Sequence, residues 1–167
     1  MFRGFATWIA DTELSQIIRD VASWLIPISQ SIHIISVCVL FTAAILISAR
    51  LLTAESGGRT VSELTRTLIP WMWGALAVLL LTGAIQTIAE PVRQFVTPVF
   101  WAKMFMIVVV IAMTAVFTAK VRANAKAWDA AASRPPGARL FAVTSIVLWV
   151  AIIVCGRFIG YTWSFYL

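Results

Sequence analysis

Residues 29–36 read Ser-Gln-Ser-Ile-His-Ile-Ile-Ser, lie inside a long apolar run and include the only histidine of the chain, His33. At the spacing i, i+1, i+4 and i+7, four of these side chains form one polar stripe on a helix: Ser29, Gln30, His33 and Ser36. The isoleucines between them would face lipid or other helices. An ionisable side chain inside a membrane span is costly, so its presence there indicates a function.

The rest of the chain is as apolar as this stretch. Of its 167 residues, 61% are hydrophobic and 12% are charged, and the mean hydropathy is +0.94. Soluble domains have about twice that charged fraction. Four continuously apolar segments, each close to the roughly 20 residues that a helix needs to cross a bilayer, lie at about 24–50, 69–90, 98–121 and 139–163. Because apolar and polar residues do not alternate, the sequence predicts an all-α, four-helix transmembrane bundle that forms one integral-membrane domain over 1–167.

The net charge of +6 is unevenly distributed. The connections between spans one and two and between spans three and four, with the helix ends beside them, contain most of the cations: Arg50, Arg59, Arg66, Lys120, Arg122, Lys126, Arg134 and Arg139. The positive-inside rule then predicts a bacterial inner-membrane protein whose N- and C-termini are both periplasmic. We interpret these cations as topology signals that contact the lipid bilayer, and not as a nucleic-acid site.

Several local signals predict where helices begin. The segment 2–22 has amphipathic spacing and predicts an interfacial helix on the periplasmic surface, capped by Asp11 or Thr12. The run Thr60–Glu63 has the form of a capping box and predicts a short helix from Val61.

Other signals concern packing and anchoring. Gly156 and Gly160 form a GxxxG motif, which favours close helix packing within the bundle. Trp128 follows a basic segment, where an aromatic ring can anchor a helix at the membrane surface.

Each predicted span carries a polar or charged group into the outer half of the membrane. These groups are His33 in span one, Gln86 and Glu90 in span two, Lys103 in span three and Arg157 in span four. One interpretation is a cluster of salt bridges that fixes helix register, with Glu90 paired to Lys103 or Arg157. The other is a cofactor site open to the outer side, in which His33 is a ligand or proton carrier, Gln30 lies beside it and the cations hold carboxylates.

The residue types limit the cofactor chemistry. Haem ligated by two histidines is excluded within one chain, because His33 is the only histidine. Haem with His/Met ligation would use Met104 or Met106. Copper would use His33 with these soft methionine sulfurs, or with the thiol of Cys38. A hydrolytic triad lacks a suitably placed carboxylate, and the chain has no phosphate-binding glycine loop.

Short motifs along the chain resemble known membrane families. The run 31–37 followed by 50–52 resembles the first helix of the HemJ-type membrane protoporphyrinogen oxidases, and 81–83 with 100–104 is similar to the bacterial copper-resistance D domain. The chain as a whole resembles an uncharacterised family of four-helix bacterial inner-membrane proteins. The resemblance implies that His33 and Lys103 are a functional pair and points to haem and porphyrin chemistry.

These observations favour a cofactor-binding subunit, with haem b or copper, in electron transfer or metal and porphyrin handling at the periplasmic side. Two alternatives stay open. The first is a non-catalytic accessory subunit of a larger membrane complex that binds lipid, pigment or quinone. The second is a small transporter or proton path. Other membrane subunits, or further copies of this chain, are the expected protein partners.

Overall fold

The protein is an all-α, multi-pass membrane protein. A computed structural model describes residues 2–53, 58–130 and 135–162, and these residues form eight helices and no strand. Four helices are long and apolar enough to cross a membrane: α3 (Ala22–Leu52), α4 (Val61–Ala89), α6 (Pro98–Ala123) and α8 (Ala138–Thr162). Four are short: α1 (Arg3–Ala10), α2 (Glu13–Asp20), α5 (Pro91–Phe95) and α7 (Ala125–Asp129). The predicted four-helix bundle is confirmed.

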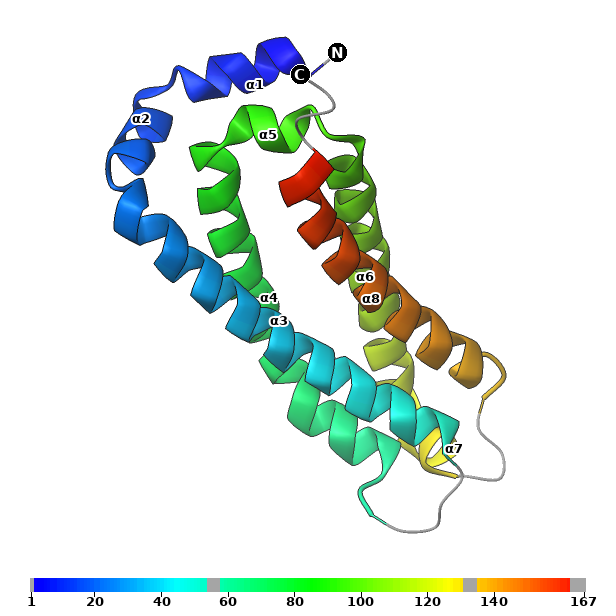
Figure 1. Ribbon diagram of the computed structural model, residues 1–167. Coiled ribbons are helices and arrows are strands. Elements are labelled where there is room, and N and C mark those ends of the chain that lie inside the picture. Colours follow the sequence, from blue (N-terminus) through cyan, green and yellow to red (C-terminus); the bar gives the residue numbers. More distant parts are fainter. Residues whose placement is uncertain (1, 54–57, 131–134, 163–167) are drawn as a thin grey trace.

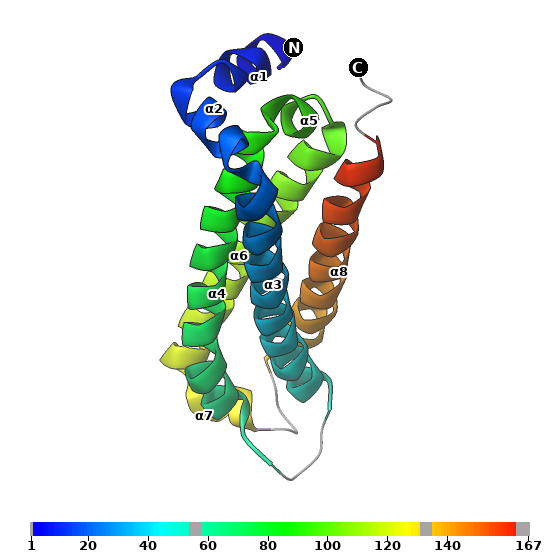
Figure 2. The same cartoon turned by 60° about the vertical axis from the view of Figure 1, so that its left-hand side comes forward.

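The long helices pack as two antiparallel pairs, α3 with α4 and α6 with α8, and α3 also packs against α8 (Figures 1 and 2). Helices α1, α2 and α5 lie across one end of the bundle, which we call the α5 end. Helix α7 lies at the opposite end, which we call the α7 end.

The hydrophobic core occupies the half of the bundle near α7. The buried apolar side chains lie within 40–51 of α3, 61–76 of α4, 110–121 of α6 and 138–152 of α8. Residues 22–39, 77–89, 98–109 and 153–162, at the other ends of these spans, contribute no member to this cluster. The ionisable side chains His33 and Lys103 lie in these end segments.

The N-terminal segment forms two helices, so the prediction of one helix over 2–22 is wrong. The backbone at Thr12 is extended, and its side chain accepts a hydrogen bond from the Ser15 amide at 3.3 Å, which starts α2. The predicted cap is thus confirmed at Thr12. The hydroxyl of Ser15 donates to the carbonyl oxygen of Ile88 at 2.8 Å and so attaches α2 to the end of α4.

Helix α4 begins at the predicted capping box. The Thr60 side chain accepts from the Glu63 amide at 3.2 Å, and the Thr60 amide donates to the Glu63 carboxylate at 3.0 Å. The helix starting at Val61 is not a separate short element, because it continues through Pro70 to Ala89. The predicted start of span two at about residue 69 is therefore too late, because the helix begins at Val61 and contains Pro70.

A polar clasp and an aromatic contact hold α7 against the bundle. Asp129 accepts hydrogen bonds from the Ser62 amide at 2.8 Å and from its hydroxyl at 2.6 Å, in the first turn of α4. Trp128 is 7% exposed and meets Phe117 edge to face, with ring centroids 5.3 Å apart. The expectation that Trp128 is a surface anchor is wrong, because this clasp places its ring in the core.

Aromatic rings join the short helices at the α5 end. Phe95 of α5 contacts Phe5 and Phe100 with centroid distances of 5.4 Å in each case. Phe2 lies 4.5 Å from Trp101, whose indole nitrogen donates to the Phe95 carbonyl oxygen at 3.1 Å. These contacts connect α1, α5 and the start of α6 in one layer.

Candidate functional site

The single histidine contacts the helix that packs against its own. His33 of α3 is half-buried, and its Nδ1 lies 2.7 Å from the hydroxyl oxygen of Thr82 on α4. That hydroxyl also lies 2.8 Å from the Val78 carbonyl oxygen, to which it donates its single proton. The hydroxyl oxygen then accepts from the Nδ1–H of His33. This pattern assigns the tautomer in which Nε2 has a free lone pair.

A glycine gives the ring its space on α4. A Cβ atom at Gly83 would lie 3.6 Å from Cε1 of His33, in van der Waals contact. A longer side chain at this position would meet the imidazole. The Thr82-Gly83 pair thus both orients the ring and leaves room for it.

The polar stripe of α3 divides between two faces. Ser29 is buried and donates to the carbonyl oxygen of Thr82 at 3.4 Å, so it shares the α4 contact with His33. Ser36 is also buried, but its hydroxyl donates within α3 to Ile32 at 2.9 Å. Gln30 is exposed. Gln30 therefore takes no part in the hydrogen bonds that join α3 to Thr82.

Lys103 reaches toward the same region from α6. It is half-buried, and it lies close enough to His33 and to Cys155 for its charge to influence both side chains. A Cβ atom at Gly156 of α8 would lie 3.5 Å from its Nζ. In the part of the chain that the structure describes, its amine forms no hydrogen bond or salt bridge.

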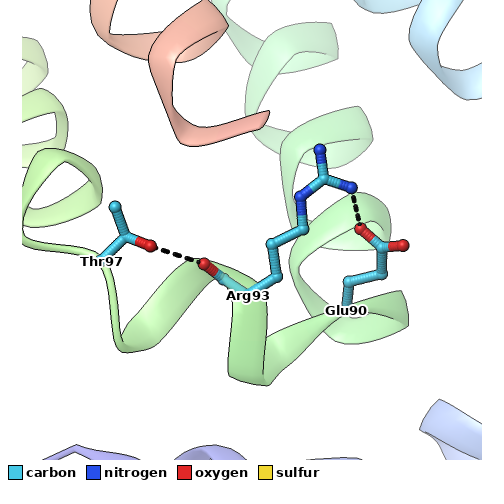
Figure 3. Close-up of polar contacts among 3 residues, drawn as sticks. All are labelled: Glu90, Arg93 and Thr97. Atoms are coloured by element: carbon cyan, nitrogen blue, oxygen red, sulfur yellow. Dashed lines mark hydrogen bonds and ion pairs between the residues drawn. The ribbon is translucent and has the colours of Figure 1, made fainter. Parts of the chain in front are cut away.

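Arg93 of α5 brings a second cation to the neighbouring turn of α8. A Cβ atom at Gly160 would lie 3.1 Å from its Nη2. Its other terminal nitrogen, Nη1, pairs with the Glu90 carboxylate at 2.6 Å, and its carbonyl oxygen accepts from the Thr97 hydroxyl at 2.9 Å (Figure 3). Glu90 thus pairs with Arg93, and not with Lys103 or Arg157 as expected.

The two glycines of the GxxxG motif on α8 lie against cationic side chains, and not against the backbone of another helix as predicted. Gly156 and Gly160 are one turn apart, and each lies beside a cationic side chain from another helix. The missing side chains give space to Lys103 and Arg93. In these contacts the motif accommodates charge, where we had expected close packing of helix backbones.

Two buried donor nitrogens complete the cluster. Gln86 lies between Thr82 and Glu90 on one ridge of α4, at spacings of four residues. Its Nε2 is buried and has no hydrogen-bond partner among the described residues, and the same holds for Nε of Arg93. Buried polar groups are nearly always hydrogen-bonded. The cluster therefore has more donors than acceptors.

The other predicted ligands form no hydrogen bond to this cluster within the described residues. Arg157 is exposed, and its guanidinium donates to the Tyr161 hydroxyl at 2.7 Å on the same helix. Met106 packs against the hydrophobic core, and Met104 is half-buried. Neither methionine sulfur forms a hydrogen bond within residues 2–53, 58–130 and 135–162. The thiol of Cys38 is exposed.

The cluster favours an anionic ligand. Lys103 and Arg93 supply positive charge, Gln86 supplies a neutral donor, and Nε2 of His33 supplies one lone pair. Carboxylates are the acceptors that such donors bind most strongly. A bare metal cation would be repelled by the two cations, and the described residues contain no group of three or more His, Cys, Asp or Glu side chains.

The sequence interpretation missed two residues of this cluster. Arg93 lies between the predicted spans 69–90 and 98–121, although Glu90 and Arg93 have the i, i+3 spacing of a helical ion pair. Thr82 has an apolar sequence neighbourhood, and its position in the Thr82-Gly83 pair was the one available signal.

The comparisons with known proteins give a family but no named relative. A family model described as "Family of unknown function (DUF6644)" matches residues 5–162, and this range contains every residue of the cluster. No curated protein and no solved structure matches the chain. The match covers nearly the whole chain, which therefore belongs to the family of unknown function DUF6644.

Proposed function

We propose that this protein is a membrane subunit that binds haem b in the half of the bundle near α5 and serves electron transfer or porphyrin handling at the periplasmic side of a bacterial inner membrane. The observation that supports this most is the hydrogen bond from His33 to Thr82, which leaves Nε2 free as a ligand. A histidine that ligates a metal nearly always donates its other ring N–H in this way.

The residues present fit the chemistry of haem. His33 would ligate the iron through Nε2, and Lys103 and Arg93 would bind the propionate carboxylates. Gln86 would donate to a carboxylate oxygen from its buried Nε2. When bound, haem supplies one-electron redox chemistry. The chain itself orients the imidazole, balances the carboxylates and surrounds the site with apolar helices.

Haem fits the cluster better than copper does. Copper would add a cation next to Lys103 and Arg93. Met106, one of the soft sulfur ligands that copper would need, packs against the hydrophobic core instead. Haem instead brings negative charge on its propionates to the two cations. The resemblance of the first span to the HemJ type supports the same choice.

The experiment that tests this is an absorption spectrum of the protein purified in detergent from cells supplied with a haem precursor. The wild type should show a Soret band, and His33→Ala should lack it. Arg157→Gln is the matched control and should keep the band, since among the described residues Arg157 donates to Tyr161 of its own helix. Size-exclusion profiles would show that each variant is folded.

Two outcomes would contradict the proposal. One is a Soret band of equal intensity in His33→Ala. The other is a wild-type protein that stays colourless after reconstitution with hemin and copurifies with a large partner, which would favour the accessory-subunit alternative.

A further inference from the structure

We propose that the groove between α3 and α4 binds one anionic phospholipid, with an acyl chain in the groove and the phosphate at Arg66. The groove lies on the membrane-facing side of two spans and has a volume of about 440 Å³. It is separate from the histidine cluster, and the two sites can be tested independently.

The groove exists because α4 lacks long side chains along one line. Pro70 and Gly74 are one turn apart and line the groove, and a Cβ atom at Gly74 would meet nothing within 4 Å. Ile35 and Val39 of α3 form the facing wall and are exposed. An open apolar groove of this kind, inside a bilayer, fits a hydrocarbon chain.

The one hydroxyl group that lines the groove is not available to a ligand. Ser36 lines the groove, but its hydroxyl donates to the Ile32 carbonyl oxygen at 2.9 Å. The polar atom is thus already hydrogen-bonded within α3. A polar head group would find no free donor there.

Charge identifies which end of the groove holds the head group. Arg66, Pro70, Gly74 and Val78 follow one another at spacings of four residues, so they form one ridge of α4, and all four are exposed. Arg66 lies at the α7 end of that ridge and forms no hydrogen bond or ion pair with any described residue. A phosphate at this position would accept hydrogen bonds from the guanidinium and balance its charge.

The length of the ridge agrees with one acyl chain. The twelve residue-to-residue steps from Arg66 to Val78 correspond to about 18 Å along a helix. One leaflet contributes about half of the roughly 30 Å hydrocarbon core. A lipid with its phosphate at Arg66 would therefore extend its chain along the groove to about the middle of the membrane. A neutral quinone would leave Arg66 without a counter-charge.

The test compares phosphatidylglycerol with phosphatidylcholine of identical acyl chains, added to the detergent-purified full chain and followed by native mass spectrometry. The wild type should retain one phosphatidylglycerol more tightly than phosphatidylcholine. Arg66→Gln should weaken phosphatidylglycerol about fivefold and remove the preference. Gly74→Leu should weaken both lipids, because its side chain fills the groove without a clash.

The matched controls lie elsewhere on the membrane-facing surface. Arg122→Gln removes an exposed cation of α6, and Val143→Leu adds bulk to an exposed position of α8. Both variants should bind the two lipids as the wild type does.

Equal binding of the two lipids by the wild type would overturn the proposal. So would unchanged binding in both Arg66→Gln and Gly74→Leu, or displacement of phosphatidylglycerol by a neutral quinone. Gly74→Ala, a smaller change, replaces Gly74→Leu if that variant fails to fold.

Discussion

The Thr82 hydroxyl determines which nitrogen of His33 can bind a ligand. It donates to Val78 and accepts from Nδ1 of the imidazole. Replacement by Val removes the acceptor and lets the ring rotate or change tautomer. The affinity for hemin should fall about 10- to 100-fold in Thr82→Val, as it does when the hydrogen-bond partner of a metal-ligating histidine is lost.

Titration of the detergent-solubilised protein with hemin, read at the Soret maximum, measures this affinity. Thr82→Ser keeps the hydroxyl and should bind nearly as the wild type does. A Thr82→Val variant with unchanged affinity would show that the hydrogen bond to His33 has no role in ligation.

Replacing Lys103 tests whether its amine belongs to a binding site or to a structural salt bridge. It is half-buried and has no acidic partner in the part of the chain that the structure describes. Lys103→Met should therefore leave the melting temperature of the ligand-free protein unchanged or raise it, because an unpaired amine is costly to bury. The same variant should bind hemin more weakly.

Thermal unfolding in detergent and a hemin titration measure the two effects together. If Lys103 instead fixes helix register through an ion pair, Lys103→Met would lower the melting temperature. That result would favour the interpretation of the polar cluster as a salt-bridge network.

At the scale of a single element, the first turn of α4 is stabilised from outside. Asp129 accepts two hydrogen bonds from Ser62, and its charge lies at the positive end of the helix dipole. Asp129→Ala should cost about 1–3 kcal/mol. The melting temperature should then fall by several degrees, at about 2–4 °C per kcal/mol for a chain of this size.

Asp20→Asn serves as the control, since Asp20 is exposed at the end of α2. It should unfold at the wild-type temperature. If Asp129→Ala also unfolds at the wild-type temperature, α7 is not held by this clasp.

Helix starts were predictable from the sequence where the signal is local. The capping box at Thr60 and the cap at Thr12 depend on residues within one turn, and both predictions are confirmed. Pro70 was less informative, because a proline can mark the start of a helix or lie inside it. The end of α4 at Ala89, just before Pro91, followed the usual restriction on residues that precede proline.

Across the whole molecule, the apolar core and the polar cluster occupy opposite halves of the bundle. Depth could be predicted, because each residue adds about 1.5 Å along a helix. The sequence therefore predicted that His33 and Lys103 both lie in the outer half of the membrane. The rotation of each helix could not be predicted, since it follows from packing between helices. This is why Arg157 was placed in the cluster, whereas Arg93 occupies the position beside Gly160.

The central claim is that Nε2 of His33 ligates haem b, and rescue by free imidazole tests it most directly. His33→Gly should lack the Soret spectrum of the wild type after reconstitution with hemin. Adding imidazole should restore that spectrum, because the small molecule can occupy the space of the missing side chain. A His33→Gly protein that binds hemin with the wild-type spectrum in the absence of imidazole would contradict the account.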